Sequence, residues 1–176
     1  IRNAFADLMS ASRELESAAA VEVVNNEPPI ISNDADLKKA IATSGVITGS
    51  LGNSFDYAWT ILGLATNNQT KLANSVAVQL AKLERPDGGF GMDQTGNTQA
   101  SSADATGISI QALWLAKKTA TSSQQSIEKT ALVGGTKYLR ETQVAGDHWE
   151  AWGDVDVNGT AYAAMGLKAV GVSVTA

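Results

Sequence analysis

The sequence predicts an all-α fold. Apolar residues recur at three- and four-residue spacing along most of the chain, and no segment alternates apolar and polar residues over a useful strand length. Glycine-rich and proline-containing segments divide this pattern into separate helices.

The 176 residues divide into an N-terminal part and one main domain. Residues 1–20 place apolar side chains on one face and predict an amphipathic helix. Pro28 and Pro29 prevent its continuation, so we expect a linker or extended arm over residues 21–32. Residues 33–176 then form a helical-hairpin repeat domain.

The first two helices of this domain have clear ends. A short helix over 35–42 follows capping residues and is closed by Gly45. The next helix covers 55–66 and is broken by Asn67 and Asn68.

The remaining helices are separated by longer loops. A helix over 70–84 runs into a loop that contains proline and several glycines. Ser102 can cap a helix over 103–118, and two more helices are expected over 124–142 and 158–170.

Three of these helices resemble one another and indicate an internal repeat. Aligned on Leu64, Leu113 and Leu167, they lie 49 and 54 residues apart, which is typical of a helical-hairpin array. Their small, weakly polar residues favour an inner position, whereas the more charged helices between them favour an outer one. In the preceding loops, we match Phe90 with Trp152 because each has glycine after it.

Two segments carry a family resemblance. LERPDGGFG at 83–91, followed by DAT at 104–106, resembles the repeat of the prenyltransferase and squalene-cyclase superfamily. GDVDVNGTAYAA at 153–164 is similar to an inner-helix segment of protein prenyltransferase β-subunits. The resemblance covers about residues 34–171 and implies an α/α toroid. With about three hairpins, the ring is open or partial, completed by further chain or by self-association.

The catalytic groups of that superfamily are not found. The chain has no Cys and a single His, His148, so the family's zinc site cannot be assembled. Asn158 replaces an arginine of the transferases, and Val157 replaces the last acid of the cyclases' Asp-x-Asp-Asp motif. No Asp-rich magnesium motif is present. The alternative is a terpenoid-type cyclase or prenyl-transfer fragment that uses Asp154 or Asp156.

Two other chemistries are considered and set aside. Asp154, Asp156 and Asn158 match the start of a calcium loop, but Met165 stands where a bidentate Glu is required. A helix start explains these residues better, so we predict no metal and no cofactor. His148 is interpreted as a structural or solvated loop residue.

Aromatic and acidic residues near the inner-helix starts are the candidate site. These aromatics either line the mouth of the array and stack on a flat or apolar ligand, or wedge adjacent hairpins apart. The acids either complement helix dipoles or contact a ligand. The candidate ligand-binding residues are Tyr57, Trp59, Asp104, Trp149, Trp152, Asp154 and Asp156.

Charge and hydropathy limit the partners. With 13 Lys and Arg against 18 Asp and Glu, the net charge of −5 argues against a nucleic-acid footprint. No window is apolar and long enough to suggest a transmembrane helix. The low charge, the many Ser, Thr, Asn and Gly residues and the absence of Cys fit an exported or cell-surface bacterial protein, which we expect, and also a cytoplasmic one. Because the catalytic groups of the resembled superfamily are not found, we expect a non-catalytic module that binds a small apolar or flat ligand or a protein partner. A purely architectural scaffold is the third possibility.

Overall fold

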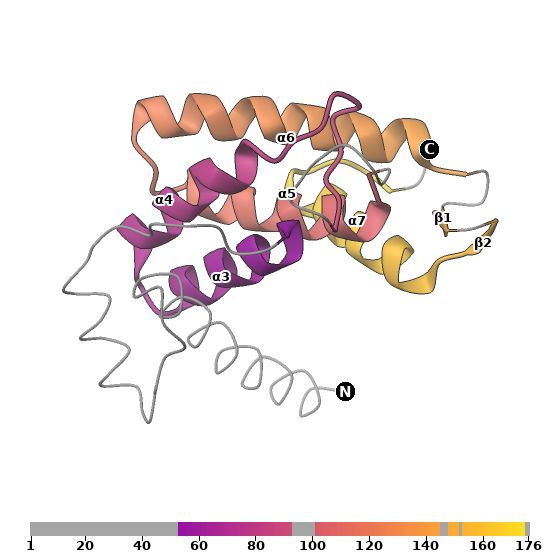
Figure 1. The fold of residues 1–176 in the computed structure, drawn as a ribbon, viewed down its shortest axis with the longest axis horizontal. Helices are drawn as coiled ribbons and strands as arrows, with labels where there is room; N and C mark the ends of the chain where they lie inside the picture. The colour runs from indigo at the N-terminus through magenta and orange to yellow at the C-terminus, as the bar shows by residue number, and fades with distance from the viewer. Residues whose placement is uncertain (1–52, 93–100, 145–147, 152, 175–176) are drawn as a thin grey trace.

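A computed structural model describes residues 53–92, 101–144, 148–151 and 153–174 (Figure 1). The predicted N-terminal helix, the arm over 21–32, the helix over 35–42 and Trp152 lie outside the described residues. The all-α prediction is confirmed, with one hairpin of two-residue strands in addition. The elements are α3 (Ser54–Thr66), α4 (Thr70–Ala81), α5 (Ala103–Lys117), α6 (Ser122–Thr142), β1 (Glu150–Ala151), β2 (Asp154–Val155) and α7 (Val157–Ala169).

The helices form two layers (Figure 1). The three helices rich in small residues, α3, α5 and α7, run side by side in one direction, with α5 in the middle. Helices α4 and α6 run back in the opposite direction and pack on α5 and on each other. The buried core lies between the layers. Its largest aliphatic members include Ile61, Leu80, Ile108, Leu113 and Leu139.

Within the inner layer, α5 and α7 pack against each other most extensively. A Cβ on Gly107 would collide with the backbone of Tyr162, and one on Gly166 would lie 2.6 Å from the Gly107 carbonyl oxygen. The two backbones therefore touch where glycine removes the side chain. This explains why α7, whose sequence is weakly amphipathic, packs so extensively on α5.

Capping decides where two helices begin. The Asn53 side chain accepts hydrogen bonds from the backbone N–H groups of Phe55 and Asp56, and the Asp56 carboxylate accepts from the Asn53 N–H. Thr121 and Gln124 form the same reciprocal box at the start of α6. These boxes start α3 and α6 one and two residues earlier than the sequence pattern predicts.

The end of α4 also differs from the prediction. The helix ends at Ala81 rather than at residue 84, and the backbone then tightens into turns with three-residue spacing. Among the described helices, none has the length and hydropathy that a membrane-spanning helix needs.

Candidate functional site at the N-terminal end of the inner layer

The loop before α5 is tied to that helix through one threonine. The backbone N–H of Phe90 donates to the Thr106 hydroxyl oxygen at 2.9 Å, and that hydroxyl lies 3.5 Å from the Phe90 carbonyl oxygen. The Phe90 carbonyl also accepts from the backbone N–H of Ser102 at 2.9 Å. Phe90 and Thr106 are both fully buried.

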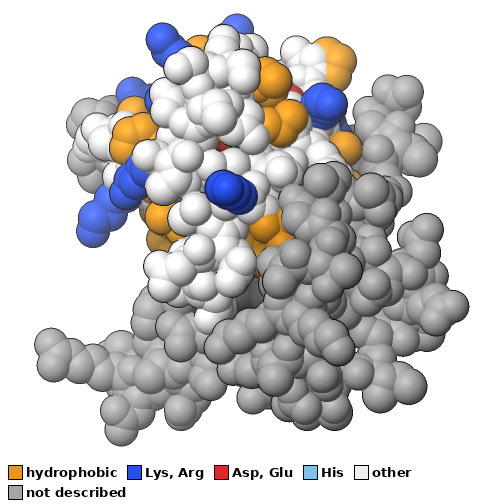
Figure 2. Space-filling view, turned by 90° about the vertical axis from the view of Figure 1, so that its left-hand side faces the viewer, with side chains coloured by type: hydrophobic (Ala, Val, Ile, Leu, Met, Phe, Trp, Pro, Cys, Tyr) orange, Lys and Arg blue, Asp and Glu red, His pale blue; other side chains and the backbone are white. Residues whose placement is uncertain are grey.

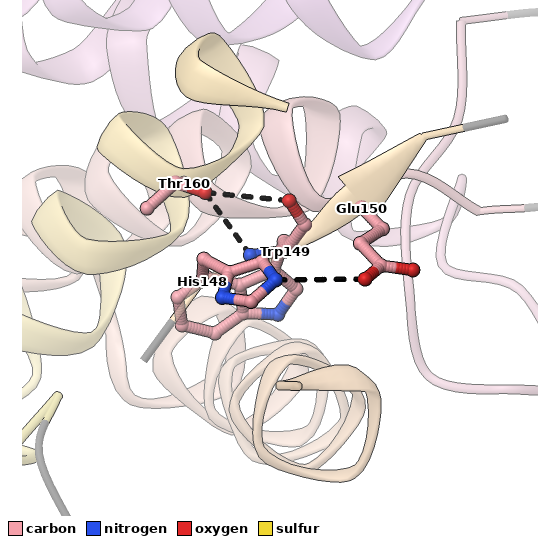
Figure 3. Close-up of polar contacts among 4 residues, drawn as sticks. All are labelled: His148, Trp149, Glu150 and Thr160. Atoms are coloured by element: carbon pink, nitrogen blue, oxygen red, sulfur yellow. Dashed lines mark hydrogen bonds and ion pairs between the residues drawn. The ribbon is translucent and has the colours of Figure 1, made fainter. Parts of the chain in front are cut away.

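The loop before α7 repeats this arrangement (Figure 3). The backbone N–H of Trp149 donates to the Thr160 hydroxyl oxygen at 3.0 Å, and the hydroxyl lies 3.4 Å from the Trp149 carbonyl oxygen. The Trp149 carbonyl accepts from the backbone N–H of Asp156 at 2.9 Å. We call the two arrangements the loop anchors, defined by Phe90 with Thr106 and by Trp149 with Thr160.

The anchors fix the alignment of the repeat. Thr106 and Thr160 lie 54 residues apart, the same spacing that separates Leu113 from Leu167. The structural equivalent of Phe90 is therefore Trp149, which corrects the pairing of Phe90 with Trp152. The sequence comparison matched the aromatic residues by the glycine that follows each of them. In the structure, the position of each aromatic residue is set instead by the hydrogen bond from its backbone N–H to a threonine hydroxyl.

Two of the predicted aromatic residues belong to the core. Trp149 is 1% exposed, and its indole N–H donates to the Leu139 carbonyl oxygen at 3.0 Å. Tyr57, on α3, is 4% exposed and packs in the same core. These side chains hold elements together and offer no free ring face, whereas Trp59 on α3 is half-buried against the core.

The predicted acids lie at helix starts and on the hairpin. Asp104 is in the first turn of α5, and its carboxylate accepts from the Ala105 N–H at 2.7 Å. Asp156 occupies the N-cap position of α7 without a capping hydrogen bond from its side chain. Asp154 is exposed on β2, where it pairs with Ala151 of β1.

Aromatic rings from α3 and α7 meet near Asp104. Phe55 and Tyr162 pack edge to face, with ring centroids 5.9 Å apart and planes at 84°. Burial, followed by the charge of Asp104, raises the pKa of the Tyr162 hydroxyl. We call Phe55, Asp104 and Tyr162 the mouth cluster. Phe55 and Asp104 lie in the first turns of α3 and α5, and Tyr162 lies in the second turn of α7.

A second tyrosine is bound into a hydrogen-bond chain beside this cluster. The Tyr138 hydroxyl donates to the Ser101 carbonyl oxygen at 2.6 Å, and the Ser101 hydroxyl donates to Asp87 at 2.8 Å. Burial, then the charges of Asp87 and Asp104, raises the pKa of Tyr138 to about 12, and Arg85 opposes this. Tyr138 therefore remains a protonated donor at neutral pH.

Sequence reasoning missed Phe55, Asp87 and Tyr138. Tyr138 lies on α6, one of the charged helices expected on the outside, whereas the predicted candidates lie on the inner helices and the loops that feed them. The signal that could have found it is its position one residue before the buried Leu139, in the part of α6 that approaches the loops.

His148 and Glu150 flank the buried Trp149. The His148 Nε2 lies 3.5 Å from a Glu150 carboxylate oxygen, with the glutamate side chain partly exposed (Figure 3). This pair lies on the hairpin strand and its approach, so it supports the structural interpretation of His148. Within the described residues, no group of three or more His, Cys, Asp or Glu side chains could hold a metal ion.

Comparisons of this protein with family models, with curated proteins and with solved structures give no match.

Proposed function

We propose that this chain is a non-catalytic binding module of an exported or cell-surface bacterial protein, built as part of an α/α toroid. The repeated loop anchor is the observation that carries the proposal, because it places equivalent loops at the same end of successive inner helices. Gln143 precedes Trp149 by six residues, as Glu84 precedes Phe90. The repeat signature of the resembled cyclases has glutamine before the loop and tryptophan after it. The second copy has both residues, whereas the first has Glu84 and Phe90, so the second copy supports the proposed superfamily relationship.

The mouth cluster is the proposed binding surface. Phe55 and Tyr162 are half-buried, so part of each ring remains accessible, and Asp104 adds a carboxylate beside them. Ring faces favour flat or cationic groups, and a neighbouring carboxylate strengthens that preference. A flat, apolar ligand with a cationic or hydrogen-bond-donating group fits these residues best.

The surroundings of Asp154 and Asp156 favour a binding module over an enzyme. Asp154 is exposed to solvent, and Asp156 starts α7 with its carboxylate against Gly159. An acid strong enough to protonate an alkene needs an enclosed environment that perturbs it. The alternative, a terpenoid-type cyclase or prenyl-transfer fragment that uses Asp154 or Asp156, requires such an environment.

Turnover separates the two classes. The module is incubated with Mg²⁺ and farnesyl diphosphate or squalene, and the products are analysed by mass spectrometry. The binding proposal expects no product above the buffer control. Product that disappears in Asp154→Asn or Asp156→Asn would overturn the proposal in favour of the enzyme.

Binding at the mouth cluster is tested with a flat aromatic cation, proflavine, by fluorescence anisotropy. We expect Tyr162→Ala and Asp104→Asn each to weaken binding about fivefold to tenfold, because each removes a ring face or a charge. Trp114→Ala, at the opposite end of α5, is the matched control and should leave binding unchanged. Equal affinity in all variants would remove the mouth cluster from the proposal.

We further propose that a second copy continues the inner layer at α7. The 54-residue offset makes Ala161 the equivalent of Gly107, the α5 residue that receives α7. Ala161 is exposed, and Val157 and Met165 on the same face are 75% and 46% exposed. Ala161→Glu should lower the mass measured by sedimentation to that of the monomer, and a wild type that is monomeric at high concentration would overturn this assembly.

A further inference from the structure

A groove lies away from the mouth cluster, between the C-terminal end of α5, the outer helix α6 and the tail that follows α7. Its volume is about 450 Å³, within the range of small-molecule sites. On the side of the molecule where α5 ends and α6 begins, Lys and Arg side chains stand among apolar patches, and little acidic surface is visible (Figure 2).

The floor of the groove is apolar. Trp114 of α5 and Leu132 and Val133 of α6 contribute to it, and Val133 is 62% exposed. Thr136 adds no unmet polar group, because its hydroxyl donates to the Leu132 carbonyl oxygen of its own helix at 2.6 Å. Such a floor gains free energy when an apolar chain displaces water from it.

One wall is built by a reversal of the chain after α7. Gly171 has φ +77°, and the backbone N–H of Val172 donates to the Leu167 carbonyl oxygen at 2.9 Å, as in a Schellman motif. The Arg140 guanidinium then donates to the Ser173 carbonyl oxygen at 3.0 Å. These bonds hold Val172 against the groove, so this wall exists before any ligand arrives.

The rim of the groove is basic, although the chain as a whole is acidic. Four of the chain's 13 Lys and Arg residues line the groove, and none of its described lining residues is acidic. Their identities are Lys117, Lys129, Lys137 and Arg140. Lys137 forms an exposed ion pair with Glu141 at 3.8 Å, which compensates its charge only weakly. The nearby buried Glu128 interacts with Lys117, but burial raises the pKa of Glu128 to about 7, so it is only partly ionised at neutral pH.

Two ammonium groups are held over the indole of Trp114. Lys117 Nζ lies 5.4 Å and Lys118 Nζ 5.9 Å from the ring centroid, which are cation–π distances. Positive charge is therefore concentrated directly beside the apolar floor. A ligand that contacts both needs an apolar part and an anionic part joined together.

We infer that this groove binds a free anionic amphiphile, with its apolar tail on Val133 and Leu132 and its carboxylate or phosphate near Lys117 and Lys129. This goes beyond the proposed function, which concerns the mouth cluster at the other end of the inner layer. The charge complementarity selects an anion, and the apolar floor selects a tail.

The test uses dodecanoate below its micelle-forming concentration, measured by isothermal titration calorimetry. Dodecyl maltoside, with the same tail and a neutral head, should bind at least about tenfold more weakly. Val133→Asp should weaken dodecanoate binding by about tenfold or more, because it places a carboxylate on the floor. Lys117→Gln should weaken it less and reduce its dependence on salt.

Controls lie on exposed positions elsewhere. Val155→Asp on the hairpin is matched to Val133→Asp, since Val155 is 58% exposed. Lys82→Gln after α4 is matched to Lys117→Gln, and circular dichroism checks that all variants are helical. Both controls should bind dodecanoate as the wild type does.

Three results would overturn the inference. The first is no dodecanoate binding. The second is a failure of specificity, seen either as equal binding of dodecyl maltoside or as an equal loss of dodecanoate binding in the Val155→Asp control. The third is binding of phosphatidylglycerol vesicles with no binding of free dodecanoate, which would assign the groove to a membrane surface. Proflavine binding at the mouth cluster is measured separately, so the two proposals fail independently.

Discussion

The two loop anchors share their backbone hydrogen bonds and differ in their side chains. In each, a threonine near an inner-helix start receives the N–H of a buried aromatic residue, at 2.9 Å for Phe90 and 3.0 Å for Trp149. Around Phe90, the chain from Asp87 through Ser101 to Tyr138 supports the loop. Around Trp149, the indole itself donates to α6.

This difference shows what the repeat requires. Both units have a threonine hydroxyl near the helix start and a large buried ring in the loop. They differ in the hydrogen bonds that link the loop to the outer helix α6. We expect the rings to be essential to stability and the individual supports to contribute less.

The largest expected effect comes from removing either ring. Phe90→Ala and Trp149→Ala should each lower the free energy of unfolding by about 3–5 kcal/mol, because each leaves a cavity in a close-packed core. Urea denaturation followed by circular dichroism measures this. A loss below about 1 kcal/mol in one variant alone would show that the anchors are not equivalent.

The largest pH effect is expected at Glu128, because it has the larger of the two raised glutamate pKa values, the other being that of Glu84. Glu128, in the N-terminal half of α6, is fully buried, and within the described residues neither carboxylate oxygen has a hydrogen-bond partner. Burial raises the pKa of Glu128 to about 7, opposed by Lys117. Because the folded pKa exceeds the usual value of 4.5, this group costs no stability below pH 4.5 and destabilises the fold as pH rises through 7.

Glu128→Gln should therefore stabilise the protein at pH 8 by up to about 3 kcal/mol and have little effect near pH 4. Urea midpoints at both pH values measure the difference. Glu141→Gln, an exposed carboxylate on the same helix, is the control and should shift neither midpoint appreciably. A Glu128→Gln variant that is less stable at pH 8 would contradict the account.

Removing the threonine hydroxyls of the loop anchors should cause the next largest loss of stability. Thr106 is fully buried and Thr160 is half-buried. Without the hydroxyl, the backbone N–H of Phe90 would therefore be left unpaired and shielded from water, whereas water could reach the N–H of Trp149 more easily. We expect Thr106→Val to cost about 1–3 kcal/mol and Thr160→Val less. Thr130→Val, on the exposed face of α6, controls for the substitution itself. The reverse order would mean that water does not reach the Thr160 anchor.

The smallest expected effect separates the two supports. Trp149→Phe keeps a ring but removes the bond to Leu139, and it should cost about 1 kcal/mol. Tyr138→Phe removes the corresponding support of the first anchor and should cost a similar amount. A double variant tests independence: additive losses support separate anchors, and a coupled loss would indicate one shared network.

Much of the fold could be predicted from the sequence. Periodicity and breakers located the five described helices, because apolar spacing and residues such as Asn67 and Asn68 act locally. The starts of α3 and α6 were displaced because reciprocal capping by Asn53 and Thr121 depends on side-chain geometry. The two-residue strands were missed because alternation has no meaning over two residues.

The candidate site was less predictable. Its acids Asp104 and Asp156 could be placed at helix starts, but burial separates Tyr57 and Trp149 from the other described candidates, and burial depends on packing between distant segments. Tyr138 and Glu128 lie on the outer helix, and only the fold reveals that one bonds Ser101 and the other is enclosed. The mouth cluster joins three helices that are far apart in sequence.

The most direct test of the repeated anchor is amide hydrogen exchange at Phe90 and Trp149, measured by NMR. We predict slow exchange at both amides, with faster exchange at Phe90 alone in Thr106→Val and at Trp149 alone in Thr160→Val, after correction for global stability. Fast exchange at either amide in the wild type, or loss of protection at the wrong amide, would contradict the repeated anchor.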